Sequence, residues 1–328
     1  MEKEELLSLI DKKVSKQGNQ GATELGSILG SVVEYLEEKT GPKCLKFTSL
    51  DEKGGVGFII NTQGSKVPKD YVEPNIEYSL DNGNTWESYE LVVSGDLEGA
   101  VKIVPGFGNS VLFRGVNSSL SYYLESKDDY LFMQCSMVGS FSAEGDVTSL
   151  LNGVGGDVPL AEACYKSMFS GCTNLTSAPA LPSTILAEGC YESMFYGCKD
   201  LVAAPVLPAT TLADSCYQSM FYGCKDLVAA PVLPATTLAN SCYTGMFSNC
   251  TGLTSHHVAT LNPSADMFDN NSACETFTID EVTPPTIANN TITGLKADCI
   301  IYVPAESVDA YKAAKFWSAR ASYIQAKP

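Results

Sequence analysis

Residues 193–213 of this chain recur letter for letter as residues 219–239, and the repetition belongs to a frame with a 26-residue period. In its clearest copies the frame reads C-Y-x-S-M-F-x-G-C-x-x-L, followed by A-P-x-L-P-A-T-T-L-A. Periods of 20–50 residues are typical of solenoids, in which each repeat buries its apolar side chains against its neighbours. The repeat therefore predicts a row of stacked coils, because one 26-residue coil cannot bury enough apolar surface by itself.

Two cysteines recur in each copy of the frame, and eight of the chain's 12 cysteines belong to it: Cys164, Cys172, Cys190, Cys198, Cys216, Cys224, Cys242 and Cys250. Four-residue steps separate the first cysteine, a methionine and the second cysteine, which would place all three on the inward face of a short helical turn. We expect buried free thiols that fill space and donate weakly to backbone carbonyl groups. A disulfide between adjacent coils and a zinc site are the alternatives, although C-x7-C differs from the usual zinc spacing.

The positions that differ between copies predict the solvent-facing side of the coils. Tyr196 and Tyr222 share one such position, and Lys199 and Lys225 share another. Together they would form an exposed aromatic and basic strip on which a glycan could stack, the plainer alternative being tyrosines that are exposed by chance. A third variable position holds Lys166, Glu192, Gln218 and Thr244.

Residues 1–42 predict a helical segment for docking or trimerisation. Apolar residues recur there at three- and four-residue steps on either side of the polar link "KQGNQGA", which indicates two short amphipathic helices. Two such helices cannot bury their stripes on each other alone, so packing on the same chain, self-association or docking on a partner must cover them. The docking residues are Leu6, Ile10, Val14, Leu25, Ile28, Leu29, Val32 and Leu36.

Residues 43–157 change to short alternating segments that predict a small antiparallel β-domain of the sandwich type. In "IEYSLDNGNTWESYELVV" the tetrapeptide Asp81-Asn82-Gly83-Asn84 indicates a hairpin turn. It lacks the further oxygen ligands of a calcium loop. The predicted domains are therefore 1–42, the β-domain 43–157, the repeats 158–280 and a C-terminal cap 281–328, an α+β fold overall. The coil from about 251 to 280 departs from the frame.

Composition and charge exclude several classes of function. The net charge of −17 argues against nucleic-acid binding, which needs a basic surface. No apolar run approaches the roughly 20 residues of a membrane span, so no membrane insertion is expected. The charged start "MEKEELLSLIDKK" does not resemble a signal peptide, which indicates synthesis in a cytoplasm. Catalytic motifs are missing and the two histidines, His256 and His257, lie outside the frame, so we expect no enzyme activity, cofactor or metal.

The frame resembles the BspA-like leucine-rich repeat, in which an aromatic residue, a Gly-Cys pair and a leucine follow in this order. The end of the chain is similar to the terminal cap of that family, in "IIYVPAESVDAYKAAKFWS" and the text around it. Such a cap is expected on physical grounds, because the last coil has an uncovered apolar edge. The segment 305–314 would supply it as an amphipathic helix.

The whole arrangement also resembles proteins of phages that infect gut Bacteroidales, including crAss-like phages. The text that carries this likeness is "LLSLIDKKVSKQGNQG", "LGSILGSVVEYL" and "EYSLDNGNTW…FRG", ahead of the repeats. The resemblance implies a head or tail fibre on the virion surface, made in the host cytoplasm. It implies a homotrimer that contacts capsid or tail proteins through its N-terminus and a host glycan or protein through its repeats. A bacterial cell-surface adhesin and a glycan-degrading fibre enzyme are the alternatives.

Overall fold

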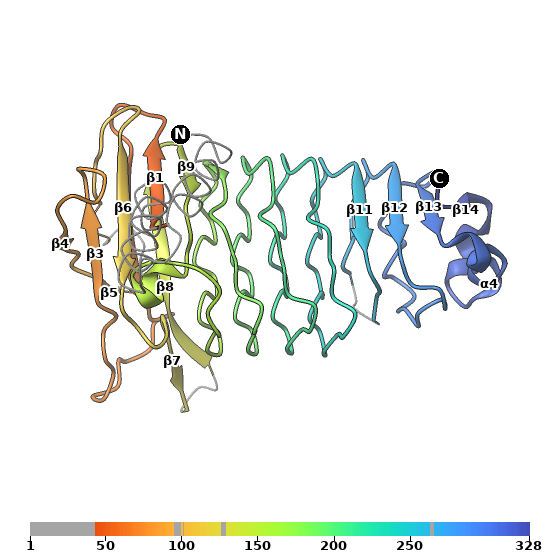
Figure 1. The fold of residues 1–328 in the computed structure, drawn as a ribbon, viewed down its shortest axis with the longest axis horizontal. Coiled ribbons are helices and arrows are strands. Elements are labelled where there is room, and N and C mark those ends of the chain that lie inside the picture. Colours follow the sequence, from red (N-terminus) through yellow and green to blue (C-terminus); the bar gives the residue numbers. More distant parts are fainter. Residues whose placement is uncertain (1–42, 95–99, 101, 126–128, 263–265) are drawn as a thin grey trace, which may run out of the picture. The chain divides into compact units, whose positions relative to one another are not determined.

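The computed structural model describes residues 43–94, 100, 102–125, 129–262 and 266–328. The predicted docking residues between Leu6 and Leu36 lie outside this part of the chain. By its contacts, Lys43–Pro328 forms one compact unit. Within that unit a β-sandwich stands at one end, a row of coils follows, and a small helical cap ends the row (Figure 1).

The sandwich consists of two sheets that face each other across an aromatic core. The first has the order β10-β9-β1-β6-β3-β4, with β1 Leu45–Ser49, β3 Ile76–Ser79, β4 Glu87–Ser88, β6 Ser110–Gly115, β9 Phe141–Glu144 and β10 Leu175–Ser177. The second has the order β5-β2-β8-β7, with β2 Gly55–Asn61, β5 Val92–Ser94, β7 Ser121–Leu124 and β8 Asp129–Val138. A short helix, α3 (Ser149–Asn152), leads from the sandwich into the coils.

The sandwich and the coils share one core, so the predicted boundary at residue 157 is not a break in packing. Phe47 packs edge-on against Phe113 at 6.0 Å and equally against Phe169 of the first coil at 6.1 Å. Strand β10, which belongs to the first coil, pairs in parallel with β9 of the sandwich. The coils therefore grow directly from a sheet edge, and this edge is covered rather than exposed.

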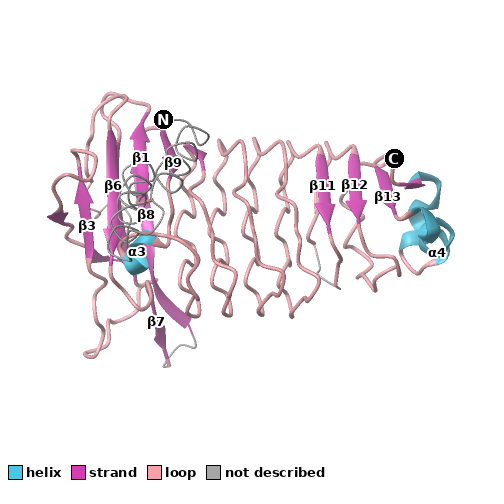
Figure 2. Ribbon diagram, viewed as in Figure 1, coloured by secondary structure: helices cyan, strands magenta, loops and turns pink. Residues whose placement is uncertain are grey.

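Chains of tight turns, and not helices, form one side of each coil (Figure 2). These turn segments are 162–171, 188–197, 214–223 and 240–249. The backbone takes a positive φ at every fourth residue, as at Ser193 (55°) and Gly197 (71°). Successive N–H groups alternate in their acceptors: that of Met194 closes a turn on Tyr191, whereas that of Phe195 donates to Met220 of the next coil at 2.9 Å. An α-helix would have used all these donors within one coil.

Because the turns repeat every four residues, two adjacent side chains of every four point into the core. In one coil these are Cys190 and Tyr191, followed by Met194 and Phe195. Each regular coil thus contributes one buried tyrosine and one buried phenylalanine to two aromatic ladders. In the phenylalanine ladder, Phe195 stacks on Phe169 at 5.4 Å and on Phe221 at 5.5 Å, with planes 16° and 2° apart. The tyrosine ladder runs through Tyr165, Tyr191, Tyr217 and Tyr243.

The irregular coil keeps its place in the phenylalanine ladder although its spacing differs. Phe268 stacks on Phe247 at 6.2 Å, and the N–H of Phe247 donates to Met267. Asn271 is fully buried and takes over the polar role of the missing cysteine: its Nδ2 donates to the carbonyl of Phe247 at 2.7 Å. The turn segment described for this coil, 266–270, is half as long as those of the regular coils, yet its phenylalanine keeps the spacing of the ladder.

The last coils form a parallel sheet that the cap covers. The sheet has the order β11-β12-β13-β14, with β11 Ser255–Val258, β12 Thr276–Ile279, β13 Ile300–Val303 and β14 Ile324–Ala326. Helices η2 Ala305–Ser307, α4 Val308–Ala313 and η3 Trp317–Tyr323 close the end. Trp317 and Tyr311 are fully buried there, edge to face at 4.9 Å. Their burial shields the apolar edge of the last coil.

The predicted α+β class is wrong. Of the described residues 27% are in strands and 7% in helices, and the strands form three sheets, one of them parallel. The error came from reading the four-residue spacing of Cys164, Met168 and Cys172 as helical, whereas turn segments produce the same spacing.

None of the helices in the described ranges is long and apolar enough to cross a membrane.

Candidate ligand-binding surfaces

The eight frame cysteines lie in the core between coils and are all free thiols. The Sγ of Cys198 donates to the Phe169 carbonyl at 3.1 Å, and Cys224 and Cys250 make the same bond one and two coils further on, at 3.2 and 2.9 Å. Burial raises the pKa of the Cys164 thiol to about 11, so it stays protonated at neutral pH. These thiols are therefore parts of the scaffold, held away from solvent and reagents.

Tyr196 and Tyr222 form a third aromatic stack on the outside of the coils. Their ring centroids are 4.7 Å apart and the planes differ by 1°, although 41% of Tyr196 is exposed. Lys199 and Lys225 are exposed beside them, and neither ammonium group makes an ion pair with a described residue. We call these four residues the tyrosine face.

The outer stack is limited to two rings by its neighbours in the row. Serine stands at the equivalent position of the coil before, Ser170, and of the coil after, Ser248. A hydroxymethyl group cannot cover a phenol ring, so no third ring extends the stack at either end. The face of Tyr196 that points away from Tyr222 is thereby left for another planar or apolar surface.

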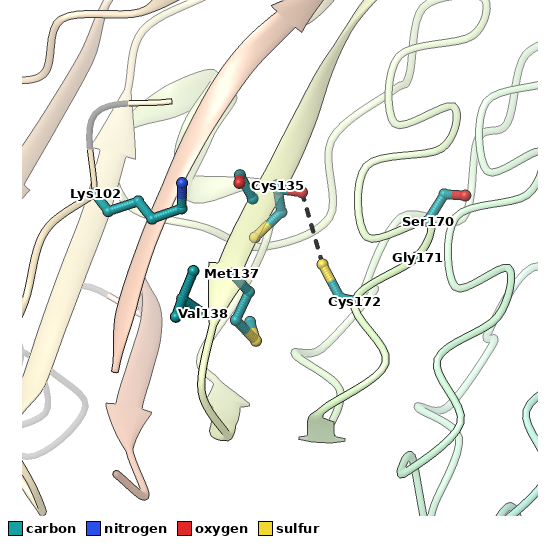
Figure 3. A pocket seen from close by; sticks show the side chains of 8 residues that line it. Lys102, Cys135, Met137, Val138, Ser170, Gly171 and Cys172 are labelled. Carbon is teal, nitrogen blue, oxygen red and sulfur yellow. Dashed lines mark hydrogen bonds between the residues drawn. The ribbon is translucent and has the colours of Figure 1, made fainter. Parts of the chain in front are cut away.

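A small pocket lies between the end of β8 and the first coil (Figure 3). It has a volume of about 220 Å³, and its lining includes Ser170, Gly171 and the end of β8 at Val138. The N–H of Gly171 donates to the carbonyl of Tyr196 at 2.8 Å, which ties the pocket wall to the tyrosine face. Lys102 lines the opposite wall. The pocket wall and the coil that carries Tyr196 are therefore hydrogen-bonded neighbours.

A second concave surface, the junction hollow, lies where the hairpin β7–β8 meets the first coils. It has a volume of about 470 Å³ and contains two aromatic rings, Tyr123 and Tyr130, with centroids 5.1 Å apart. Lys166, Glu192 and Gln218 from one variable position of the frame also line it. Side chains that the repeat placed in open solvent are therefore inside a hollow.

Ion pairs and hydrogen bonds already engage the polar groups of the junction hollow. The ammonium of Lys166 lies 3.4 Å from Glu192 and 3.6 Å from Asp129. The hydroxyl of Tyr130 donates to Glu162 at 3.0 Å, and burial, together with this carboxylate, raises the pKa of the phenol. The sequence alone could not reveal this site, because sandwich and coil residues separated by up to 95 positions build it.

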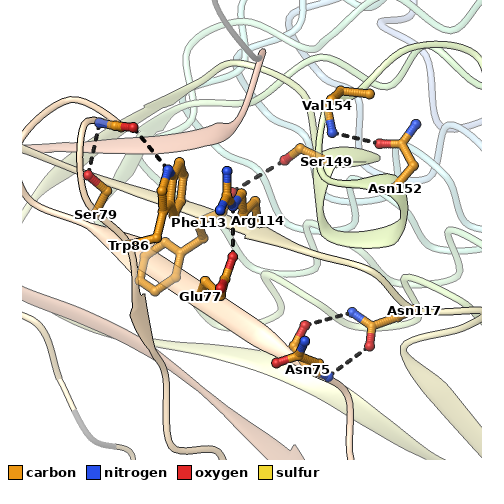
Figure 4. Close-up of polar contacts among 11 residues, drawn as sticks. Asn75, Glu77, Ser79, Trp86, Phe113, Arg114, Asn117, Ser149, Asn152 and Val154 are labelled. Atoms are coloured by element: carbon orange, nitrogen blue, oxygen red, sulfur yellow. Dashed lines mark hydrogen bonds and ion pairs between the residues drawn. The ribbon is translucent and has the colours of Figure 1, made fainter.

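A third pocket, of about 380 Å³, lies beside α3, and Glu77 and Arg114 in its lining belong to a network of polar contacts (Figure 4). The guanidinium of Arg114 stacks 3.9 Å from the centre of the Trp86 ring, and its Nε donates to Glu77 at 2.8 Å. The indole N–H of Trp86 in turn donates to the carbonyl of Gly83. These contacts hold the β3–β4 turn against β6, which is a structural role.

The two histidines occupy opposite environments and do not act together. His256 is buried among phenylalanine rings, and burial lowers its pKa to about 4. His257 is half-exposed, with its Nε2 3.0 Å from a carboxylate oxygen of Asp280. No group of three or more His, Cys, Asp or Glu side chains in the described part of the chain could hold a metal ion.

Comparison with known proteins finds neither a family model nor a curated protein that matches this chain. The structure therefore supplies the functional argument. Of the surfaces described above, the tyrosine face and the junction hollow are concave or aromatic and reach solvent. The cysteine ladders are buried, and the partly exposed Arg114 network holds a turn in place.

Proposed function

We propose that this chain is a non-enzymatic fibre protein of a phage particle that displays its coils for binding to a glycan on the host surface. Its support is the resemblance of the repeats and of the segments before them to BspA-like and phage fibre sequences, together with the exposed tyrosine face. In this proposal the protein is made in the host cytoplasm and becomes part of the virion surface. Residues 1–42 trimerise and contact a capsid or tail protein.

The tyrosine face carries the proposal, because it is rigid without being part of the core. Tyr196 follows the buried Phe195, and Tyr222 follows the buried Phe221, so each outer ring is held at coil spacing by an inner ring. Because these side chains are already ordered, ligand binding carries little entropic cost for fixing them. An ordered and exposed aromatic surface of this kind is suited to binding a ligand, whereas it adds little to the stability of the core.

The chemistry of the tyrosine face fits a neutral saccharide. An aromatic ring offers an apolar plane to the C–H groups of a sugar, and nearby polar groups can bind its hydroxyls. Lys199 is followed by Asp200, and Lys225 by Asp226, so each ammonium group has a carboxyl group next to it in the chain and the local charges balance. A hydroxyl group can use both kinds of partner, whereas a strongly charged ligand would meet repulsion from one of them.

Glycan hydrolysis is the second candidate, and the junction hollow is the surface that favours it. Glycosidases use two carboxyl groups about a sugar's glycosidic bond, and Glu162 and Glu192 both line the hollow. Glu192 forms an ion pair with Lys166, and Glu162 accepts a hydrogen bond from Tyr130, so both carboxylates already have structural partners. Release of reducing sugar from a polysaccharide that binds the protein would favour the enzyme over the passive fibre.

Binding to immobilised neutral oligosaccharides tests the tyrosine face. We expect Tyr196→Ala to weaken binding about tenfold, the loss of one aromatic contact of roughly 1.4 kcal/mol. Tyr222→Ala should act in the same direction by removing the ring that supports Tyr196. Tyr323→Ala in the cap is the matched control and should bind as the unaltered protein does. Unchanged binding by Tyr196→Ala, with loss in Tyr123→Ala, would move the ligand to the junction hollow.

The virion location has its own test, which separates the fibre from a bacterial surface adhesin. Mass spectrometry of purified phage particles should detect peptides of this chain at a stoichiometry that is a multiple of three. Detection on the bacterial envelope and absence from particles would instead support the adhesin, with the same glycan-binding face.

A further inference from the structure

Cys274 and Cys299 differ from the frame cysteines, because their sulfur atoms lie against each other. The two Sγ atoms are 3.6 Å apart, and both residues are buried, with 0% and 1% of their surface exposed. Cys274 precedes β12 and Cys299 precedes β13, two strands that pair in parallel. The pair therefore sits at the same end of two adjacent coils, under the cap.

The frame thiols are arranged in the opposite way. Cys198 and Cys224 occupy equivalent positions on adjacent coils, but each thiol donates to a phenylalanine carbonyl. Hydrogen bonds to the backbone thus direct the sulfur atoms of this ladder along the row. Beyond the frame the arrangement changes. Cys274 and Cys299 have longer contacts to backbone carbonyls, of Thr276 at 3.4 Å and Ile300 at 3.8 Å, and their sulfur atoms also contact each other.

The surroundings of Cys299 favour its thiolate. The hydrogen bond with Cys274, together with the nearby guanidinium of Arg320, lowers the pKa of Cys299 below its ordinary value. The same contact and burial raise the pKa of Cys274. Arg320 is held in place by the carbonyls of Lys296 and Leu295, at 2.9 Å each. One member of the pair is thereby suited to attack and the other to resolve.

We propose that Cys274 and Cys299 are an oxidation site, which a small-molecule disulfide converts into a staple between the last coils. In the first step the Cys299 thiolate attacks one sulfur of the reagent, a mixed disulfide forms, and one thiolate leaves. In the second step Cys274 loses its proton to solvent and attacks the Cys299 sulfur, which expels the second thiolate. Two cysteine thiols are oxidised, and one reagent disulfide is reduced to two thiols. The sulfur atoms need approach by only about 1.5 Å to reach the bonded distance.

The staple would act on the stability of the capped end. It links residues 25 positions apart and therefore lowers the conformational entropy of the unfolded chain. The folded state changes little, so the free energy of unfolding rises. Because both sulfur atoms are buried, the reagent reaches them when the cap opens, so oxidation is slow and the bond, once formed, is protected. The inference does not depend on the proposed glycan binding.

Incubation of the full chain with oxidised glutathione tests the site. After acid quenching, the intact mass should be about 2 Da lower, and chymotryptic peptides 269–277 and 296–302 should be found joined. The oxidised protein should unfold at a temperature roughly 5 °C higher than the reduced one. Both changes should disappear in Cys274→Ser and in Cys299→Ser.

Two controls keep the test decisive. Cys198→Ser removes a frame thiol that is equally buried, and it should leave the cross-link and the rise in unfolding temperature intact. The incubation is repeated with warming to just below the unfolding transition, so that the cap opens. A cross-link between Cys135 and Cys172 instead, a stable glutathione adduct, or no loss of mass after warming would each overturn the proposal.

Discussion

Replacement of Phe195 by alanine is expected to lower the free energy of unfolding by about 3–5 kcal/mol. The side chain is fully buried and stacks on a phenylalanine of each neighbouring coil, at 5.4 and 5.5 Å. Its removal leaves a cavity that the coils cannot close, because the inter-coil hydrogen bond of Phe195 fixes their spacing. Urea unfolding followed by circular dichroism measures the change.

The adjacent residue provides a matched control. Tyr196→Ala also removes one aromatic ring from a stack of the same period, but that stack is exposed. We expect a loss of less than about 1 kcal/mol, since little apolar surface is taken out of the core. Equal losses in the two variants would contradict the assignment of inner and outer ladders. Tyr196→Ala would then report folding and not binding in the glycan experiment.

Acidification from pH 7 towards 4.5 is expected to destabilise the coils through His256. Burial lowers the pKa of this imidazole to about 4, whereas an unfolded histidine titrates near 6.5. Between these values the unfolded chain binds a proton that the folded chain does not, so stability is full above pH 6.5 and falls as the pH decreases. The complete loss corresponds to about 3 kcal/mol.

The contacts of His256 explain why a proton is excluded. Its ring centroid lies 4.6 Å from that of Phe268 and 5.1 Å from that of Phe247. The Nε2 atom is 2.9 Å from Oδ1 of Asn271, and burial outweighs this hydrogen bond, which by itself would raise the pKa. A charged imidazole would therefore be buried against aromatic rings and one amide, with little to compensate its desolvation.

The slope of stability against pH distinguishes His256 from the other acid-sensitive groups. His256→Gln and His256→Phe should both flatten the slope between pH 6.5 and 4.5, whatever their absolute stability. His257→Gln is the matched control at the adjacent position and should keep the slope, since that side chain is half-exposed whereas His256 is buried. The pKa of Asp280 is lowered, and its effect is lost only as the pH falls further, through the ordinary range of a carboxyl group. An unchanged slope in both His256 variants would reject the prediction.

The candidate surfaces show how far repetition carries a prediction. Because Tyr196 and Tyr222 occupy equivalent positions in adjacent copies, the period itself predicts that they are neighbours, and their rings are 4.7 Å apart. The junction hollow could not be found in this way. Tyr123 and Tyr130 come from a sandwich hairpin, and only the folded chain brings them beside Lys166 of the first coil. Nothing in the local sequence of that hairpin marks a binding surface.

By itself, the sequence determined which residues of this protein are equivalent and which of them vary, because a 26-residue period can be read directly. The tertiary structure decided what conformation the equivalent residues adopt. Cysteines and a methionine at four-residue steps fit both a helix and a chain of turns, and their local sequence does not choose between them. The choice falls to turns because alternate N–H groups, such as that of Phe195, donate to the neighbouring coil, and those acceptors exist only after the coils have stacked.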